Sequence, residues 1–192
     1  MNQSLEKGQS VSVSGAAGAF GEVHIKLMWS DKPEQGKASG IDLDLGCLFE
    51  LKDGYLGCVQ ALGDMYGSFS SEPYIELDAD DRTGGSAGET IRINGDKWAA
   101  IKRICIFAYI YDGAPNWSLI DCLAQVLIPG REPIMVQLEN ARNDRGMCAI
   151  TMLENKENAF KVQKLNQYFR THKDLDEHYG FGLRWEIGSK DG

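Results

Sequence analysis

The sequence predicts an all-β protein, a two-sheet β-sandwich with one or two short helices. Apolar and polar residues alternate along many short segments, which is the period of two expected of half-buried strands. Glycine-containing turn signals separate these segments at short spacing, as is typical of sandwiches. Only two segments carry a helical pattern, so helices are expected to be minor elements.

The alternating segments give the strands in order. The strand over 101–111 is apolar on both faces beyond Arg103, which predicts a central strand that is covered on each side. The segment 160–169 fits a helix or a strand, and we interpret it as a strand. The other predicted strands are 23–29, 41–49, 74–78, 91–93, 134–138, 147–153 and 183–187.

Turn and helix signals fall between the strands. We expect a single helical turn over 96–101 and a short helix over 173–179, with Thr171 or Asp174 as its N-cap. There is no internal repeat, low-complexity tract or linker, so one domain over 1–192 is expected. The turn signals are Asp53-Gly54, Gly84-Gly85, Asn94-Gly95-Asp96, Asp112-Gly113, Pro129-Gly130 and Arg145-Gly146.

Composition and charge indicate a globular protein with a cationic partner. Of 192 residues, 43% are apolar and 25% are charged, and 28 acids against 20 bases give a net charge of −8. Phosphates attract bases, so this charge argues against nucleic acid or an anionic membrane surface as the main partner. A metal ion is the simplest cation, although the charge also serves solubility.

The termini and cysteines favour a reduced, cytoplasmic protein. The N-terminus lacks the apolar stretch of a signal peptide, and no run of about 18 apolar residues is present, so no direct membrane insertion is expected. The five cysteines are odd in number and widely spaced, which favours free thiols that pack as small hydrophobes. No C-x-x-C pair is present, and the three histidines lie far apart in sequence, so a zinc site is not expected.

The first acidic motif lies on a predicted strand. Asp42 and Asp44 stand at positions i and i+2, so both carboxylates project from one face, with Cα atoms roughly 6–7 Å apart. Ile41, Leu43 and Leu45 are expected to enter the core behind them. A cation between the two carboxylates would relieve their repulsion, and calcium takes 6–8 oxygen ligands at roughly 2.3–2.6 Å. A solvated strand face is the alternative interpretation.

The second acidic motif frames a glycine-rich loop. Its acids are Asp78, Asp80, Asp81 and Glu89. With Asp78 as position 1, Glu89 falls at position 12 of an EF-hand loop, but Thr83 stands where glycine is required and no flanking helices are evident, so an EF-hand is rejected. A flexible loop that offers carboxylates and free carbonyls to a cation remains, with an acidic surface turn as the alternative.

A third acid ends the most apolar strand. Asp112 follows the run from Ile104 to Tyr111, where an acid usually meets a cation, a cap or water. The alternative is an Asx turn with Gly113. We therefore predict that Asp112 joins the other six acids at a calcium site.

These motifs resemble those of the TerD/TerA family of tellurite-resistance and bacterial stress proteins. The opening segment 4–13, SLEKGQSVSV, resembles S-L-x-K-G-x-x-V-x-L, and Trp29 followed by IDLDL at 41–45 resembles G-W-D…D-F-D-L-D-A. The loop from Asp80 to Glu89 resembles G-D-N-x-x-G…D-D-E, and IYDG at 110–113 resembles I-Y-D-A. The resemblance extends from about residue 4 to about residue 189. The sequence departs from the family pattern at several positions, and these departures favour a TerA-like member over TerD.

The resemblance implies a β-sandwich that binds one or two calcium ions at one edge. It also implies a role beside other proteins of Ter operons, some at the membrane. Gly40 stands in place of the family's first aspartate, and Arg82 adds a positive charge to a loop with fewer acids, so one ion is the safer expectation.

Three kinds of function compete. The first is a calcium-binding stress-response module that acts through protein interactions and is not an enzyme. The second is catalysis by the paired carboxylates Asp42 and Asp44, or tellurite chemistry by thiols; no histidine or serine nucleophile motif accompanies the carboxylates. The third is a calcium-assisted carbohydrate- or lipid-binding sandwich that uses the aromatic residues Tyr66, Phe69, Tyr111 and Trp117.

Overall fold

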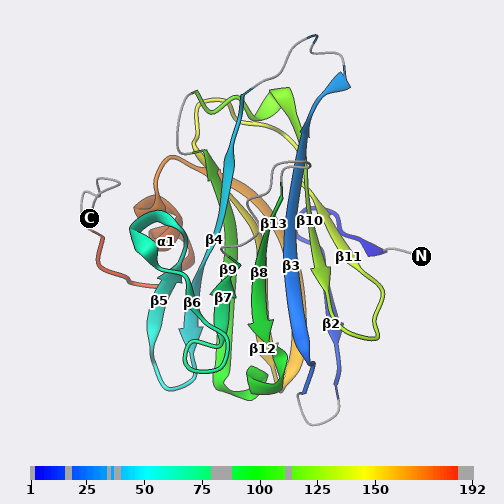
Figure 1. Cartoon of the computed structure of the whole chain (residues 1–192), viewed down its shortest axis with the longest axis vertical. Coiled ribbons are helices and arrows are strands. Elements are labelled where there is room, and N and C mark those ends of the chain that lie inside the picture. Colours follow the sequence, from blue (N-terminus) through cyan, green and yellow to red (C-terminus); the bar gives the residue numbers. More distant parts are fainter. Residues whose placement is uncertain are drawn as a thin grey trace.

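Two β-sheets packed face to face form the body of the protein (Figure 1). The computed structural model describes residues 3–15, 19–33, 36, 40–78, 88–110 and 114–185. Neighbouring strands pair antiparallel, except β1 and β11, which pair parallel. The predicted two-sheet β-sandwich is therefore confirmed.

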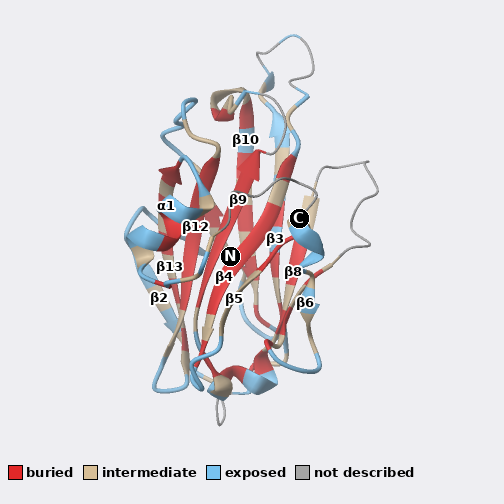
Figure 2. Ribbon diagram, turned by 90° about the vertical axis from the view of Figure 1, so that its left-hand side faces the viewer, coloured by how far each residue is buried: buried red, intermediate tan, exposed pale blue. Residues whose placement is uncertain are grey.

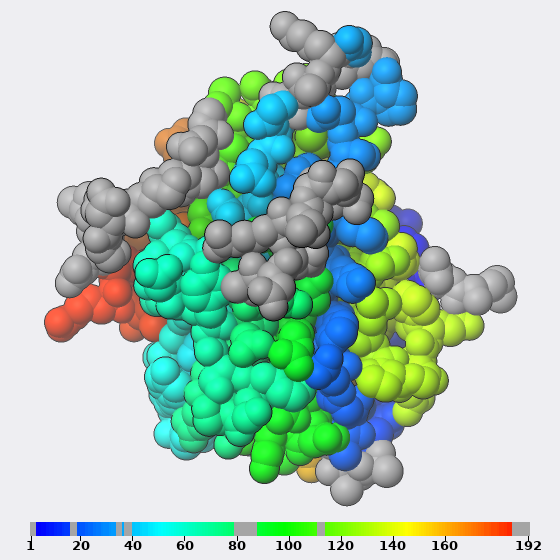
Figure 3. Space-filling model, viewed as in Figure 1, coloured from blue at the N-terminus to red at the C-terminus, as the bar shows by residue number. Residues whose placement is uncertain are grey.

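The first sheet has seven strands, with β3 at its centre. Its strands, in spatial order, are β1 (Gln3–Ser4), β11 (Ile134–Gln137), β10 (Ile120–Leu127), β3 (Glu22–Asp31), β8 (Gly88–Asn94), β7 (Ile75–Leu77) and β6 (Gly67–Ser68). The outer face of this sheet is turned toward the viewer in Figure 3, where β3 in blue runs beside the yellow-green β10 and β11.

The second sheet has six strands and is covered on both of its faces. Its strands, in spatial order, are β2 (Ser10–Val13), β13 (Ala159–Phe169), β12 (Met147–Lys156), β9 (Ile101–Ile110), β4 (Leu43–Leu51) and β5 (Leu56–Val59). The short helices are η3 (Leu62–Asp64), η4 (Gly95–Ala100), η5 (Trp117–Leu119) and α1 (His172–Tyr179).

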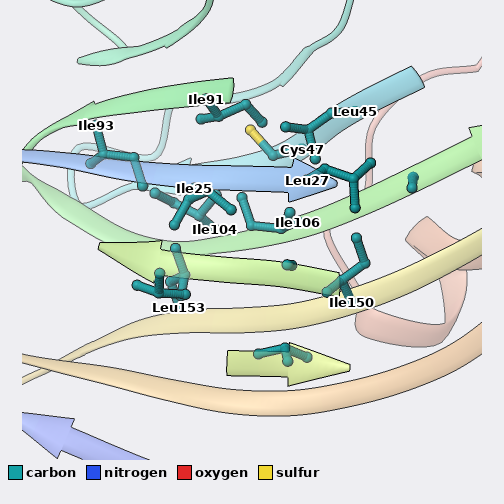
Figure 4. Packing of buried hydrophobic residues seen from close by; sticks show 14 of the residues in the cluster. Ile25, Leu27, Leu45, Cys47, Ile91, Ile93, Ile104, Ile106, Ile150 and Leu153 are labelled. Carbon is teal, nitrogen blue, oxygen red and sulfur yellow. The ribbon is translucent and has the colours of Figure 1, made fainter. Parts of the chain in front are cut away.

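The main core lies between the two sheets. Alternate residues of each strand point inward: Ile25 and Leu27 on β3 and Leu45 and Cys47 on β4 are completely buried. In Figure 4, Ile91 of β8 lies against Leu45 and Cys47 of the opposite sheet. Burying each such aliphatic side chain contributes about 1.5–3 kcal/mol. Buried residues accordingly line the inside of the sandwich, while the exposed ones gather on its loops and ends (Figure 2).

The outer face of the first sheet is polar. Arg92 donates to Glu76 and Glu22 at 2.8 Å each, and His24 lies 2.6 Å from Glu22. The hydrogen bond from Arg92, and then that from His24, lowers the pKa of Glu22 to about 2. These residues alternate with the buried ones on the same strands, as the period of two predicts.

A second apolar cluster covers the outer face of the second sheet. It joins Leu48, Phe107 and Tyr109 of the strands to Leu175 of α1 and to Phe181, which follows the helix. All residues of β9 from Ile104 to Ile110 are consequently buried, which confirms the prediction of a central strand covered on each side.

The helix α1 has defined ends. The Thr171 side chain accepts the backbone N–H of Asp174 at 3.1 Å, so Thr171 is the N-cap. Gly180 ends the helix with φ +69°, a conformation that favours glycine. Arg103 of β9 donates to the carbonyl oxygens of Tyr179 at 2.7 Å and Gly180 at 3.1 Å, which fixes the helix C-terminus on the second sheet.

Most predicted elements are present, one predicted strand is wrong, and the strands β1, β2, β5, β6 and β10 were not predicted. The strand over 160–169, the turn over 96–101 and the helix near 173–179 are confirmed as β13, η4 and α1. The predicted strand over 183–187 is wrong for its described part, because residues 181–185 pair with no strand and are held by a side chain of α1. β10 was missed because its inward side chains include the small Cys122 and Ala124, which weaken the alternating pattern.

In the part of the chain that the structure describes, no helix is long and apolar enough to cross a membrane.

Candidate metal centre

Asp42 and Asp44 lie where β4 begins. Leu43 and Leu45 are completely buried, as predicted, and Asp44 between them is half-buried on the outer side of the second sheet. Asp42 is exposed and precedes the strand, so the strand begins later than expected. The indole N–H of Trp29 on β3 donates to the Ile41 carbonyl at 3.3 Å and ties this segment to the first sheet.

Glu89 connects the two sheets beside Asp44. It follows Gly88 at the start of β8, and its carboxylate oxygen Oε2 accepts the backbone N–H of Leu45 at 2.5 Å. β5 pairs with β4 only from Cys47 onward, so Leu45 lies beyond the end of β5. A strand-edge N–H requires a partner, and Glu89 supplies it from the opposite sheet.

Asp78 is held beside Glu89 through the backbone. Its N–H donates to the Thr90 carbonyl at 2.9 Å, immediately beyond the last paired residue of β7. Asp78 is half-buried, as is Glu89. We call Asp42, Asp44, Asp78 and Glu89 the acidic edge.

The charges of the acidic edge act on a buried phenol. Tyr109 of β9 stands directly opposite Asp44 of β4, and 5% of its surface is exposed. Burial, then the charge of Asp44 and more weakly those of Cys58 and Glu89, raises the pKa of the Tyr109 hydroxyl, and a hydrogen bond with the Leu62 backbone partly offsets this shift. The sequence patterns did not single out Tyr109, because the register between β4 and β9 cannot be read from them.

The described part of the acidic edge is incomplete as a metal site. Among the described residues, no group of three or more histidines, cysteines, aspartates or glutamates is arranged to hold a metal ion. Asp80, Asp81 and Asp112, which are also predicted ligands, lie outside the described residues. The structure thus brings Glu89 to the residue after Asp44 from a distant part of the sequence. Asp42 precedes Asp44 along the chain, and Asp78 is held opposite Thr90, the neighbour of Glu89.

The chemistry of this edge suits a hard cation. The donors are carboxylates, and oxygen ligands are those that calcium prefers. A carboxylate has two oxygens, so Glu89 retains one when the other accepts the Leu45 N–H. Two carboxylates brought close together also repel, which a bound cation would relieve.

Similarity to known proteins agrees with this fold. The chain is 41% identical to the tellurium resistance protein TerA of Alcaligenes sp; the match covers 89% of this chain, which spans 53% of the length of that relative. No family model matches the sequence.

Two solved structures share the fold. A homologue of the telluride resistance protein TerD from Streptomyces coelicolor A3(2) superposes with a TM-score of 0.55 at 14% identity, covering 86% of this chain and 99% of the other. The protein of unknown function SAV2460 superposes with a TM-score of 0.54 at 12% identity, with the same shares covered. The two structures share the fold, and the 41% identity to TerA places the chain in the TerD/TerA tellurium-resistance family, closer to TerA.

Proposed function

We propose that this protein is a cytoplasmic calcium-binding module of tellurite resistance and the stress response. It acts through protein interactions and not as an enzyme. The observation that supports the calcium site is the bond between Glu89 and the Leu45 N–H, which sets a carboxylate of one sheet beside Asp44 of the other. The membership in a tellurium-resistance family supports the biological role.

The ion ties the two sheets together at the acidic edge. Its proposed ligands come from both sheets and from the loop that follows Leu77. One ion is proposed, or two if the loop completes a second site, and either would stiffen this edge as a surface for other Ter-operon proteins, including those at the membrane. The proposed ligands are Asp42, Asp44, Asp78, Asp80, Asp81, Glu89 and Asp112.

Two observations favour interaction over chemistry or sugar binding. Burial raises the pKa of every cysteine thiol, that of Cys122 to about 12, so the thiols are poor nucleophiles toward tellurite. Two of the four aromatic rings that a sugar could stack on are also engaged, since Arg92 lies 4.4 Å above the Phe69 ring and Trp117 is 3% exposed.

The test is thermal unfolding in calcium and in chelator. A ligand at a hundredfold excess over its Kd stabilises the folded state by about 2.7 kcal/mol, which for a chain of this size raises the Tm by roughly 5–10 °C. Asp44→Asn keeps the shape of the side chain and removes one charge, so it is expected to abolish this rise. Glu89→Gln retains an acceptor for the Leu45 N–H, so it is expected to preserve the Tm in chelator and to lose the response to calcium.

The matched control is Asp53→Asn. Asp53 is an exposed acid beyond the other end of β4, where it accepts the Tyr55 N–H at 2.9 Å. This variant should keep the full response to calcium. Equal melting curves of the unmodified protein in calcium and in chelator would eliminate the proposed function.

A further inference from the structure

An apolar patch lies on the outer face of the first sheet, beside the polar network of Arg92. Alternate residues of β3, β10 and β11 are buried in the main core, so the residues between them point outward. The apolar ones among these belong to neither of the two apolar clusters, and Met28 of β3 is 37% exposed. In Figure 3 this part of the face is the blue of β3 and the yellow-green of β10 and β11. We call Met28, Leu123, Leu127 and Met135 the outer patch.

Two opposite charges flank the centre of the outer patch. Met28 of β3 stands directly opposite Leu123 of β10. Lys26 lies one outward position to one side of this pair, and Asp121 lies one outward position to the other side. Both are exposed, and neither forms an ion pair within the described chain. They are separated by four residues along the strands, about 13 Å, so they cannot pair with each other in one molecule.

We propose that the outer patch binds a second copy of this chain, in a symmetric dimer whose two β3 strands run in opposite directions. With the two-fold axis at the level of Met28 and perpendicular to the strands, each Lys26 lies level with Asp121 of the second copy. An axis parallel to the strands would instead place Lys26 level with Lys26. The charges therefore favour the antiparallel arrangement, in which an ion pair forms on each side of an apolar centre.

The charge of the molecule also favours this face for self-association. The chain carries a net charge of −8, so most contacts between two copies would bring like charges together. At the outer patch, Lys26 and Asp121 cancel, and the neighbouring Arg92 is already paired with Glu22 and Glu76. Repulsion between two copies is thus weakest where the apolar side chains are.

The size of the outer patch indicates a weak dimer. Three strands at about 4.8 Å spacing and the eight residues of β10 at about 3.3 Å rise cover roughly 14 by 26 Å of sheet. This area is below the roughly 800 Å² that each partner buries in a standard interface. The dimer is therefore expected to be reversible, with a Kd of roughly 10–100 μM.

The first test measures self-association by sedimentation equilibrium in chelator, at concentrations on both sides of this Kd. Met28→Asp puts two carboxylates opposite each other at the centre of the contact, so it should weaken dimerisation about a hundredfold. The matched control is Met65→Asp. Met65 is 39% exposed and lies between the edge strands β5 and β6, away from the outer patch, so this variant should keep the Kd.

The second test exchanges the two charges. Lys26→Glu places a carboxylate level with Asp121 of the second copy, and Asp121→Lys places an ammonium group level with Lys26. Each contact occurs twice in a symmetric dimer, so each single variant should weaken dimerisation about tenfold. The double variant restores unlike charges and should return the Kd to within about twofold of the unmodified protein. This recovery is specific to self-association, because a different partner would not carry the exchanged charges.

Three outcomes would overturn the dimer. The first is an unmodified protein that stays monomeric up to about 1 mM, which would assign the outer patch to a different partner. The second is an equal loss in Met65→Asp, since the contact would then not depend on the outer patch. The third is a double variant that dimerises more weakly than either single variant. Because every measurement is made in chelator, none of these outcomes depends on the proposed calcium site.

Discussion

At the scale of single residues, two polar side chains link distant segments. Glu89 connects the two sheets at the Leu45 N–H, and His172 connects α1 to Tyr109 and Gln60. Each is a half-buried polar group, which is stable only when its hydrogen bonds are made. Both positions are therefore sensitive to changes of charge, and for His172 this predicts a dependence on pH.

The stability of the protein should fall in mild acid because of His172. Burial lowers the pKa of its imidazole to about 4, against about 6.5 in the unfolded chain. The unfolded state therefore takes up a proton first, so stability is full above about pH 6.5 and is lost as the pH falls toward 4. From pH 7.5 to pH 5.0 the free energy of unfolding should fall by about 2 kcal/mol, measured by urea denaturation.

The control for this prediction replaces the imidazole. His172→Gln can still hydrogen-bond to Gln60 but does not titrate, so its stability should change little over the same interval. His178→Gln should behave as the unmodified protein does, because His178 is exposed. The lowered pKa of Glu22 changes the free energy of unfolding only below about pH 4.5, which lies outside the interval from pH 7.5 to pH 5.0. An equal loss in His172→Gln would contradict the role of this histidine.

At the scale of elements, α1 and the segment 181–185 form one unit around Asp176. This carboxylate is 2% exposed and accepts the N–H groups of Gly182 at 2.7 Å, Leu183 at 2.8 Å and the Trp185 indole at 2.6 Å. Three donors offset the cost of burying the charge. The segment is thereby held against the second cluster without pairing in a sheet.

Replacing Asp176 by asparagine should detach this segment. An amide offers one oxygen in place of two and directs an NH₂ group at a donor, so Asp176→Asn should cost about 2–4 kcal/mol in urea denaturation, and the fluorescence of Trp185 should shift to that of an exposed indole. The control is Asp174→Asn in the exposed first turn of the same helix, where the loss should stay below about 1 kcal/mol. Similar losses in both variants would show that the position of the carboxylate is unimportant.

Elements with a strong periodic pattern could be predicted from sequence, and those fixed by tertiary contacts could not. The ten residues of β9 and the N-cap at Thr171 are visible in the sequence because local rules define them. The pattern of Leu183, Trp185 and Ile187 also resembles a strand, but the buried carboxylate of Asp176 in the preceding helix holds the described part by hydrogen bonds. The predictions were therefore least accurate where one buried polar group replaces sheet pairing.

At the scale of the whole molecule, the sequence could predict which strands carry the acids but not how the sheets align. The alternation of Asp42 and Asp44 with buried leucines follows from the period of two. The contact of Glu89 with Leu45 depends on the packing of two sheets, and the opposition of Tyr109 to Asp44 depends on strand register. Neither is encoded in a local pattern, so the residues of the site could be named while the contacts that position them could not.

The two apolar clusters predict two classes of thiol. Cys47, Cys122 and Cys148 lie in the main core between the sheets, whereas Cys58 and Cys105 belong to the second cluster beneath α1 and the segment after it. Local opening of a small unit costs less free energy than global unfolding. In the native protein at pH 8, Cys58 and Cys105 should therefore react with a thiol reagent before the other three, and all five should react at once in guanidinium.

Asp176→Asn makes this thiol prediction specific. Because this variant loosens the cover over the second cluster, it should speed the labelling of Cys58 and Cys105 and leave the labelling of Cys47, Cys122 and Cys148 limited by global unfolding. Mass spectrometry of labelled peptides identifies the thiols. If all five cysteines react within seconds in the native protein, the thiols are accessible, and direct chemistry with tellurite becomes a better explanation of the protein's role than binding of a cation.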